Sequence, residues 1–224
     1  MFYVKNNGLC FLFQKSFGTS GVNAIGSFQL SQLNSSSVQS KLKAAGINTN
    51  SKQYKAAVKQ MMSAGNGAMY GNIQGIKNLM SHYDKDGDYI NPVNGLAGLL
   101  VTDENESSRK RIISIPDSSK EEMYELTKKE FLRENGVHNG DTTKRTDVYN
   151  NLYRKMSKKD RLAAGYTLEK YERIYRQAFY DAAKKADPNW EIGKPIKAGA
   201  LDDVTRETAE TGKSPAQATL DTKI

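Results

Sequence analysis

Acidic residues are absent from the first 83 positions of this 224-residue chain, and their absence divides the sequence into two parts. The first part carries eight lysines and no arginine, so it holds the whole formal net charge of +8. The remaining 25 Lys and Arg are matched by all 25 Asp and Glu, which makes residues 84–224 formally neutral. We therefore expect a distinct basic N-terminal part beside a charge-balanced remainder.

The N-terminal stretch has the composition of a solvated arm. It is rich in Ser, Asn and Gln, as in SFQLSQLNSSSVQS at 27–40, and such a segment has little apolar surface to bury. Residues 1–35 are therefore predicted to form a flexible basic arm. The apolar run Leu9–Phe13 is shorter than the roughly 7 to 15 residues of a secretory signal and the roughly 20 of a membrane-spanning helix. We expect no membrane insertion, and any export would use no cleavable signal peptide.

Residues 36–82 show the apolar spacing of amphipathic helices. Ser51 is suited to cap a helix that ends at Gly65-Asn66-Gly67, and shorter helices are predicted at 38–45 and 72–80. We expect these helices to form a small cluster around a shared core. The apolar face of the helix after Ser51 consists of Tyr54, Ala57, Val58, Met61 and Met62.

Residues 83–116 change from helical spacing to turn signals. An Asp-Gly pair between the flanks Tyr83 and Tyr89-Ile90 predicts a β-hairpin. The aliphatic runs 99–101 and 111–115 are separated by a polar stretch, and they are expected to pair as antiparallel strands.

Three carboxylates alternate in this hairpin, at Asp84, Asp86 and Asp88, as they do in calcium-binding loops. The glycine and the glutamate that such a loop requires are out of register with them. We therefore expect a plain Asp-Gly turn. A calcium site at these three aspartates is the alternative.

Residues 117–201 are predicted to form a three-helix unit. The first helix, at 119–134, begins with capping-box spacing of Ser and Glu. The second begins near Val148 and ends at Gly165, and the third runs from a Thr167 cap to the Asp187-Pro188 stop. Residues 202–224 have little to bury and are expected to form a flexible tail. The whole chain is therefore predicted to be mainly α with a small antiparallel β-hairpin element, an α+β arrangement.

Several kinds of chemistry are excluded by the residues present. A single cysteine, Cys10, forms no internal disulfide, and with only His82 and His138 the chain lacks the ligands of a structural Cys/His zinc site. Neither histidine has a recognisable catalytic partner in the sequence. We expect no enzyme activity and no cofactor, and an enzyme of unrecognised type stays the alternative.

A second function class, nucleic-acid binding, follows from the charge. The lysine-only N-terminal half is suited to attract a polyanion inside the cell, although bidentate contacts to bases and phosphates are mostly made by arginine. The basic cluster Arg109-Lys110-Arg111 is diluted by acidic neighbours such as Glu104 and Glu106. Nucleic-acid binding is therefore the alternative to a protein partner or self-assembly.

Four stretches of the chain are distinctive: LKAAGINTNSKQYKA (42–56), YDKDGDYINPVNGLAGLLVTDEN (83–105), RKRIISIPDSSK (109–120) and ADPNWEIGKPI (186–196). In these stretches the chain resembles an uncharacterised domain-of-unknown-function family of Gram-positive bacteria. The resemblance covers about Val22 to Leu201 and includes no catalytic signature. It implies a bacterial source and assigns no activity. Together, these observations predict a non-catalytic bacterial binding or assembly protein.

Overall fold

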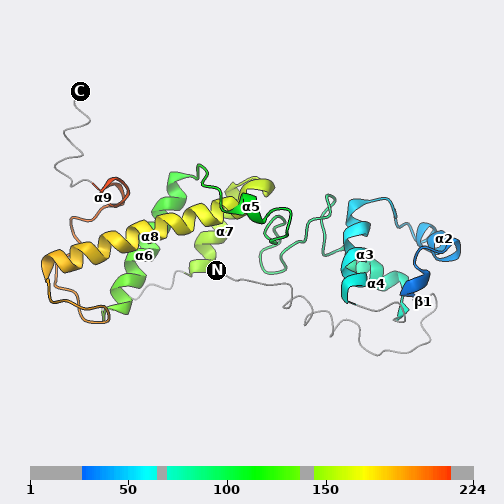
Figure 1. Ribbon diagram of the computed structural model, residues 1–224, viewed down its shortest axis with the longest axis horizontal. Coiled ribbons are helices and arrows are strands. Elements are labelled where there is room, and N and C mark those ends of the chain that lie inside the picture. The colour runs from blue at the N-terminus through cyan, green and yellow to red at the C-terminus, as the bar shows by residue number, and fades with distance from the viewer. Residues whose placement is uncertain (1–26, 65–69, 137–143, 213–224) are drawn as a thin grey trace, which may run out of the picture. The chain divides into compact units, whose positions relative to one another are not determined.

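The computed structural model describes residues 27–64, 70–136 and 144–212, and it divides the chain into two compact units (Figure 1). The first unit is Met1–Leu100 and the second is Val101–Ile224. The division between units therefore lies within the stretch 83–116 that the sequence sets apart as a hairpin region.

Short helices and one minimal pair of strands form the described part of the first unit. The strands β1 and β2 pair antiparallel, with Phe28 opposite Gly71 and Gln29 opposite Tyr70. In chain order the elements are β1 (Phe28–Gln29), a 3-10 turn (Leu30–Gln32), α2 (Ser36–Ala44), α3 (Lys52–Ala64), β2 (Tyr70–Gly71) and α4 (Ile73–Met80).

Polar side chains cap the three helices of this unit. The Ser51 hydroxyl accepts a hydrogen bond from the Tyr54 backbone N–H at 3.1 Å, which confirms the predicted cap of α3. Ser35 caps α2 in the same way, and Asn72 caps α4 through a 2.7 Å bond from the Gly75 N–H. These caps satisfy backbone donors that the first helical turn leaves unpaired.

The core of the first unit includes part of the segment that the sequence assigns to a flexible arm. Phe28, Leu30 and Leu33 are each no more than 4% exposed, so the prediction of a flexible arm is wrong for residues 27–35. Apolar residues spaced through the Ser-rich run provide enough buried surface to dock it. Residues 1–26 lie outside the described part. The rest of this core comes from Val38, Leu42, Ile47, Tyr54, Ala57, Met61, Ile76, Leu79 and Tyr83.

The predicted hairpin is present only as two isolated antiparallel bridges, Tyr83 with Tyr89 and Ile90 with Ala97. Gly87 turns the chain with a φ of 86°, and a Cβ there would lie 3.0 Å from the Lys52 carbonyl oxygen. The pairing predicted between 99–101 and 111–115 is wrong, because neither run is a strand.

The longest helix in the described part of the second unit is α8, and the other four α-helices there pack against it (Figure 1). The backbone N–H of Ile113, in the run predicted as a strand, donates to the Thr167 hydroxyl of α8 at 3.1 Å. The elements are α5 (Glu106–Arg109), α6 (Asp117–Glu134), α7 (Arg145–Lys155), a 3-10 turn (Lys158–Asp160), α8 (Arg161–Ala186) and α9 (Arg206–Thr211).

Helices α6, α7 and α8 pack around one aromatic-rich core. Tyr175 and Phe179 of α8 are fully buried, and Tyr124 of α6 contacts both rings at centroid distances of 5.4 and 5.5 Å. Trp190, which follows α8, is 4% exposed and packs against Phe131. The three predicted helices of this region therefore share one core.

Two predicted helix boundaries in this unit are wrong. Gly165 does not end a helix, and Thr167 does not cap one, because both lie buried inside α8. The Thr167 hydroxyl instead donates to the Ala163 carbonyl at 2.8 Å. The predicted capping box of α6 is also absent, since Pro116 precedes the helix and no side chain caps it.

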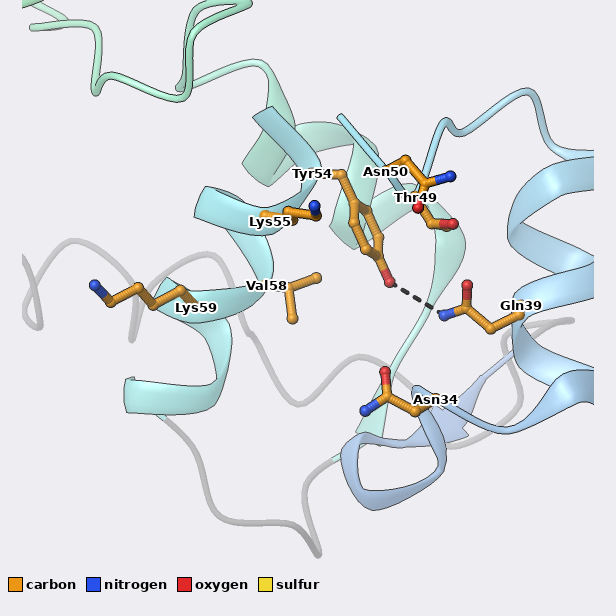
Figure 2. A pocket seen from close by; sticks show the side chains of 8 residues that line it. All are labelled: Asn34, Gln39, Thr49, Asn50, Tyr54, Lys55, Val58 and Lys59. Atoms are coloured by element: carbon orange, nitrogen blue, oxygen red, sulfur yellow. Dashed lines mark hydrogen bonds between the residues drawn. The ribbon is translucent and has the colours of Figure 1, made fainter. Parts of the chain in front are cut away.

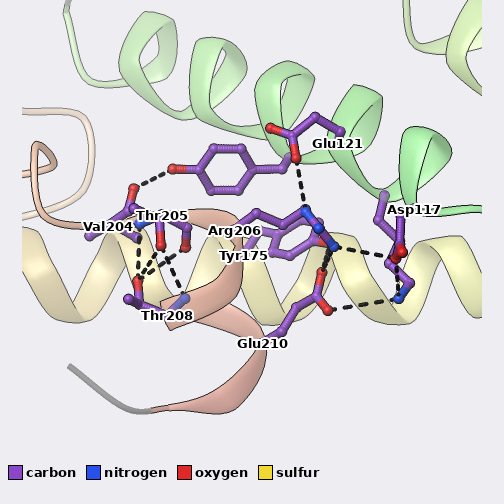
Figure 3. Close-up of polar contacts among 10 residues, drawn as sticks. Asp117, Glu121, Tyr175, Val204, Thr205, Arg206, Thr208 and Glu210 are labelled. Carbon is purple, nitrogen blue, oxygen red and sulfur yellow. Dashed lines mark hydrogen bonds and ion pairs between the residues drawn. The ribbon is translucent and has the colours of Figure 1, made fainter. Parts of the chain in front are cut away.

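Helix α9 lies in the stretch that the sequence assigns to a flexible tail, so that prediction is wrong for residues 202–212. Figure 3 shows Arg206 of α9 between Glu121 of α6, at 2.8 Å, and Glu210, at 2.9 Å. The Tyr175 hydroxyl donates to Glu210 at 2.7 Å, and the Tyr124 hydroxyl donates to the Val204 carbonyl. Residues 213–224 lie outside the described part.

The predicted fold class, mainly α with a minor β element, is confirmed, although the paired strands are β1 and β2. Among the described residues, no helix has the length and apolar character needed to cross a bilayer.

Candidate binding site

Lysines dominate the charged surface of the first unit. Six lie in its helices or next to them, all are exposed, and none makes an ion pair within the described part of the chain. No Asp or Glu occurs before Asp84 in the sequence, so helices α2, α3 and α4 contain no acidic side chain. They come from three helices, and we use the name lysine face for the set as a group of exposed charges: Lys41, Lys43, Lys52, Lys55, Lys59 and Lys77.

A hollow of about 570 Å³ lies beside two of these lysines. Its walls come from α2, from α3 and from the two loops that flank α2 (Figure 2). Its volume falls in the range typical of ligand sites, about 300 to 1,000 Å³. The lining residues are Asn34, Gln39, Thr49, Asn50, Tyr54, Lys55, Val58 and Lys59.

Hydrogen bonds fix the position of the hollow's central groups. Gln39 donates from Nε2 to the Leu33 carbonyl at 2.9 Å and to the Tyr54 hydroxyl at 3.5 Å, a contact drawn in Figure 2. Tyr54 is 6% exposed and belongs to the core, and its hydroxyl points toward Gln39 at the hollow (Figure 2). The loop before α3 is held by the Asn48 side chain, which accepts from the Asn50 N–H at 3.0 Å.

Five other polar side chains around this hollow make no hydrogen bond or ion pair with the described part of the protein. Asn34, Asn50, Lys55 and Lys59 are exposed, and Thr49 is half-buried. These groups include amide donors, amide acceptors and two cations. The hollow is therefore chemically complementary to a ligand that carries negative charge and peptide-like or hydroxyl groups.

A second hollow, of about 480 Å³, lies between α8 and α9 in the second unit. Most of its polar groups bond to one another or to their own helix. Arg173 contacts Glu169 at 3.1 Å, and Gln177 donates to Asp181 at 2.8 Å. Because its donors and acceptors are already paired, this hollow offers less to a ligand than the first.

Several charged groups of the second unit are similarly paired. Arg145 lies between Glu172 and Glu130, and its hydrogen bonds to these carboxylates raise its already high pKa further. In the predicted basic cluster, Arg111 contacts Asp160 at 3.0 Å, and Arg109 is 8% exposed with Glu106 at 3.8 Å. The cluster at 109–111 therefore does not form an open basic patch.

The candidate calcium ligands are not gathered into a site. One oxygen of Asp84 accepts hydrogen bonds from the backbone N–H groups of Asp86 and Asp88, each at 2.9 Å, so this carboxylate stabilises the turn. Nowhere in the described ranges do three His, Cys, Asp or Glu side chains meet as they would around a metal ion. Calcium binding at these aspartates stays a prediction.

The structure describes only one of the two histidines. His82 is exposed beside the Asp84 turn, and His138 and Cys10 lie outside the described residues. The lining residues Asn34, Gln39, Thr49 and Asn50 were missed by sequence reasoning. Their only signal was the cluster of amide and hydroxyl residues on either side of α2.

Comparison with known proteins gives one family. A family model described as a domain of unknown function (DUF3879) matches residues 47–224. The match begins later and extends further than the resemblance noted in the sequence. No curated protein and no solved structure matches the chain.

Proposed function

The chain belongs to this domain-of-unknown-function family (DUF3879), and from that premise we propose that it is a non-catalytic binding protein whose first unit docks an acidic protein partner. The observation that carries the proposal is the lysine face, six exposed cations without an acidic neighbour on the same helices. No carboxylate on these helices balances the six cations, and an acidic partner would supply the opposite charge.

The second unit has a different role in this proposal, because many of its charged side chains contact one another. Several of its arginines contact carboxylates of other helices, as Arg145 contacts Glu130 and Glu172. Such interhelical networks fix one arrangement of the helices and leave little unbalanced charge for a partner. We assign this unit a scaffold role.

The chemistry of the lysine face favours protein over nucleic acid. Lysine binds phosphate as a point charge, whereas base reading relies on the planar arginine fork, which α2, α3 and α4 lack. Proteins that bind single strands also present exposed aromatic rings for stacking, and the one ring at the hollow, Tyr54, is buried.

Binding of the full chain to polyglutamate, measured at increasing salt concentration, tests the proposal. We expect binding that weakens as salt rises, because counterions compete for the lysines. Replacing Lys43, Lys52 and Lys59 together by Gln should weaken binding by about threefold to about a hundredfold, since each exposed ion pair contributes about 0.2 to 1 kcal/mol. The control replaces three exposed lysines of the second unit, Lys170, Lys185 and Lys197, and should change binding little.

Oligonucleotides of matched charge serve as the competing ligand. Binding to DNA or RNA that is tighter than binding to polyglutamate would favour the nucleic-acid alternative. Absence of binding to both polyglutamate and the oligonucleotides at low salt would contradict the proposed acidic partner and the nucleic-acid alternative together. A bacterial source and export without a cleavable signal peptide belong to the same proposal, and fractionation of the native culture tests them.

A further inference from the structure

The spacing of two lysines in the hollow corresponds to the repeat of an extended peptide. Lys55 and Lys59 lie on successive turns of α3 (Figure 2). Four residues of α-helix rise about 6 Å. In an extended chain, alternate side chains lie on the same side and repeat every 6.6 Å or so. The backbone positions of Lys55 and Lys59 therefore match two acidic side chains separated by one residue, and the long lysine side chains, which point in different directions in Figure 2, turn at the surface to meet them.

The amide groups of the hollow fit the backbone of the same peptide. Asn34 and Asn50 each offer a side-chain carbonyl and an NH₂ group, and neither side-chain amide has a hydrogen-bond partner in the described ranges. A peptide unit presents one N–H and one C=O, which a side-chain amide can pair simultaneously. The Tyr54 hydroxyl adds a further donor, because its oxygen already accepts from Gln39.

Charge repulsion within α3 provides an independent argument. Two lysines four residues apart on one helix destabilise it by a few tenths of a kcal/mol. Elsewhere in the chain comparable cations face a carboxylate on the same helix, as Arg173 faces Glu169. At Lys55 and Lys59 the compensating charge is absent from the helix, so a carboxylate of a bound ligand would remove this penalty.

We infer that the hollow recognises an extended peptide segment with acidic residues at alternate positions, its carboxylates at Lys55 and Lys59 and its backbone at Asn34, Asn50 and Tyr54. This inference rests on the proposed docking of an acidic partner and adds the sequence pattern of that partner's contact segment.

Two labelled peptides of identical composition test the pattern. In one, Gly and Glu alternate, and in the other the glutamates stand in adjacent pairs, so that neighbouring carboxylates point to opposite sides. Fluorescence anisotropy with the full chain should show tighter binding of the alternating peptide by about three- to fivefold, the factor expected from one additional exposed ion pair.

Single substitutions locate the preference. Lys55→Gln and Lys59→Gln should each abolish the preference for the alternating peptide. The matched control Lys77→Gln removes an exposed lysine from α4, outside the hollow. It should weaken the binding of both peptides equally, so that the preference for the alternating peptide remains. Tyr54→Phe keeps the buried ring and should weaken the binding of both peptides about equally, because the inferred contact of the hydroxyl is with the peptide backbone, which the two peptides share.

The outcomes separate this inference from the proposed function. Equal affinity of the wild-type chain for both peptides, or binding of polyglutamate without either peptide, would overturn the inference and leave the proposed function standing. A preference that Lys77→Gln abolishes as completely as Lys55→Gln would also overturn it. Failure to bind polyglutamate and both peptides would overturn the two together.

Discussion

Gly165 lies in the interior of α8, and an added Cβ there would be 2.5 Å from the Tyr153 hydroxyl oxygen and 3.1 Å from a ring carbon. Gly165→Ala should destabilise the second unit by about 1 to 2 kcal/mol, because overpacking costs more than the roughly 1 kcal/mol that alanine gains in a helix. Thermal unfolding followed by circular dichroism measures the change.

Another helical glycine provides the matched control. A Cβ on Gly75 of α4 would meet nothing closer than 3.4 Å, so Gly75→Ala should be neutral or stabilising by up to about 1 kcal/mol. Adding Tyr153→Phe to Gly165→Ala removes the nearest atom and should recover part of the loss. A stabilising effect of Gly165→Ala alone would contradict the packing argument.

Phenol groups of the second unit link its stability to alkaline pH. Burial raises the pKa of Tyr124 to about 12, with Glu125 and Glu121 adding to the shift, and burial likewise raises the pKa of Tyr153 to about 12. Unfolded tyrosine releases its proton near pH 10, while the folded chain retains it. Stability should therefore fall as pH rises from about 10 to 12, by at most about 3 kcal/mol for each phenol.

Urea unfolding at about pH 8 and about pH 11 measures this loss. Tyr124→Phe should be less stable at the lower pH, because the hydrogen bond to Val204 is lost. It should also lose less stability on going to the higher pH. An unchanged pH dependence in that variant would show that Tyr124 does not contribute.

At the scale of elements, α9 combines a strong cap with a short length. Its six residues are too few to form an isolated stable helix. Thr205 and Thr208 form a capping box, with the Thr205 hydroxyl accepting from the Thr208 N–H at 3.1 Å. Thr205→Ala should reduce hydrogen-exchange protection of α9 by about fivefold, corresponding to about 1 kcal/mol.

Thr205→Ser retains the capping hydroxyl and should preserve the protection. Both variants should leave the exchange of α6 and α8 unchanged, because those helices have their own core. Loss of protection throughout the second unit in Thr205→Ala would mean that α9 unfolds only together with that core.

The helices were largely predictable from sequence, and their ends less so. Apolar spacing placed α3 and α4 within a few residues, since Ser51 and Asn72 act through local hydrogen bonds. Gly165 and Thr167 were misread because α8 holds both residues through tertiary contacts that no local rule includes. The run 111–115 has strand composition, but its Ile113 N–H bonds to Thr167 of α8.

For the whole molecule, separate cores predict separate unfolding transitions. Leu42 and Leu168 are fully buried in the first and second unit. Leu42→Ala and Leu168→Ala should each cost about 2 to 5 kcal/mol and lower the midpoint of a different transition in calorimetry. A common shift of one transition in both variants would show that the units unfold cooperatively.

Salt should move these two transitions in opposite directions. Screening weakens the ion pairs of the second unit, such as Arg145 with Glu130 and Glu172, so its midpoint should fall. The same screening relieves repulsion within the lysine face, so the midpoint of the first unit should rise. Equal shifts in both would contradict this assignment of charge.

The sequence predicted the lysines of the candidate site but not the hollow beside them. The absence of acidic residues marks the lysine face directly, because net charge is independent of the fold. The hollow was not predictable, since Asn34, Asn50 and Tyr54 meet only after α2 and α3 pack. Tyr54 also belongs to a core-facing helical stripe, which conceals its polar end.

The distribution of glutamate provides a means of cutting the chain between its units. Its first glutamate is Glu104, which is exposed and lies four residues beyond Leu100, the last residue of the first unit. A glutamate-specific protease therefore has no site within the first unit, whether that unit is folded or unfolded. Limited digestion should accumulate a product that ends at Glu104, readable by intact mass, and that fragment carries the entire lysine face in one piece.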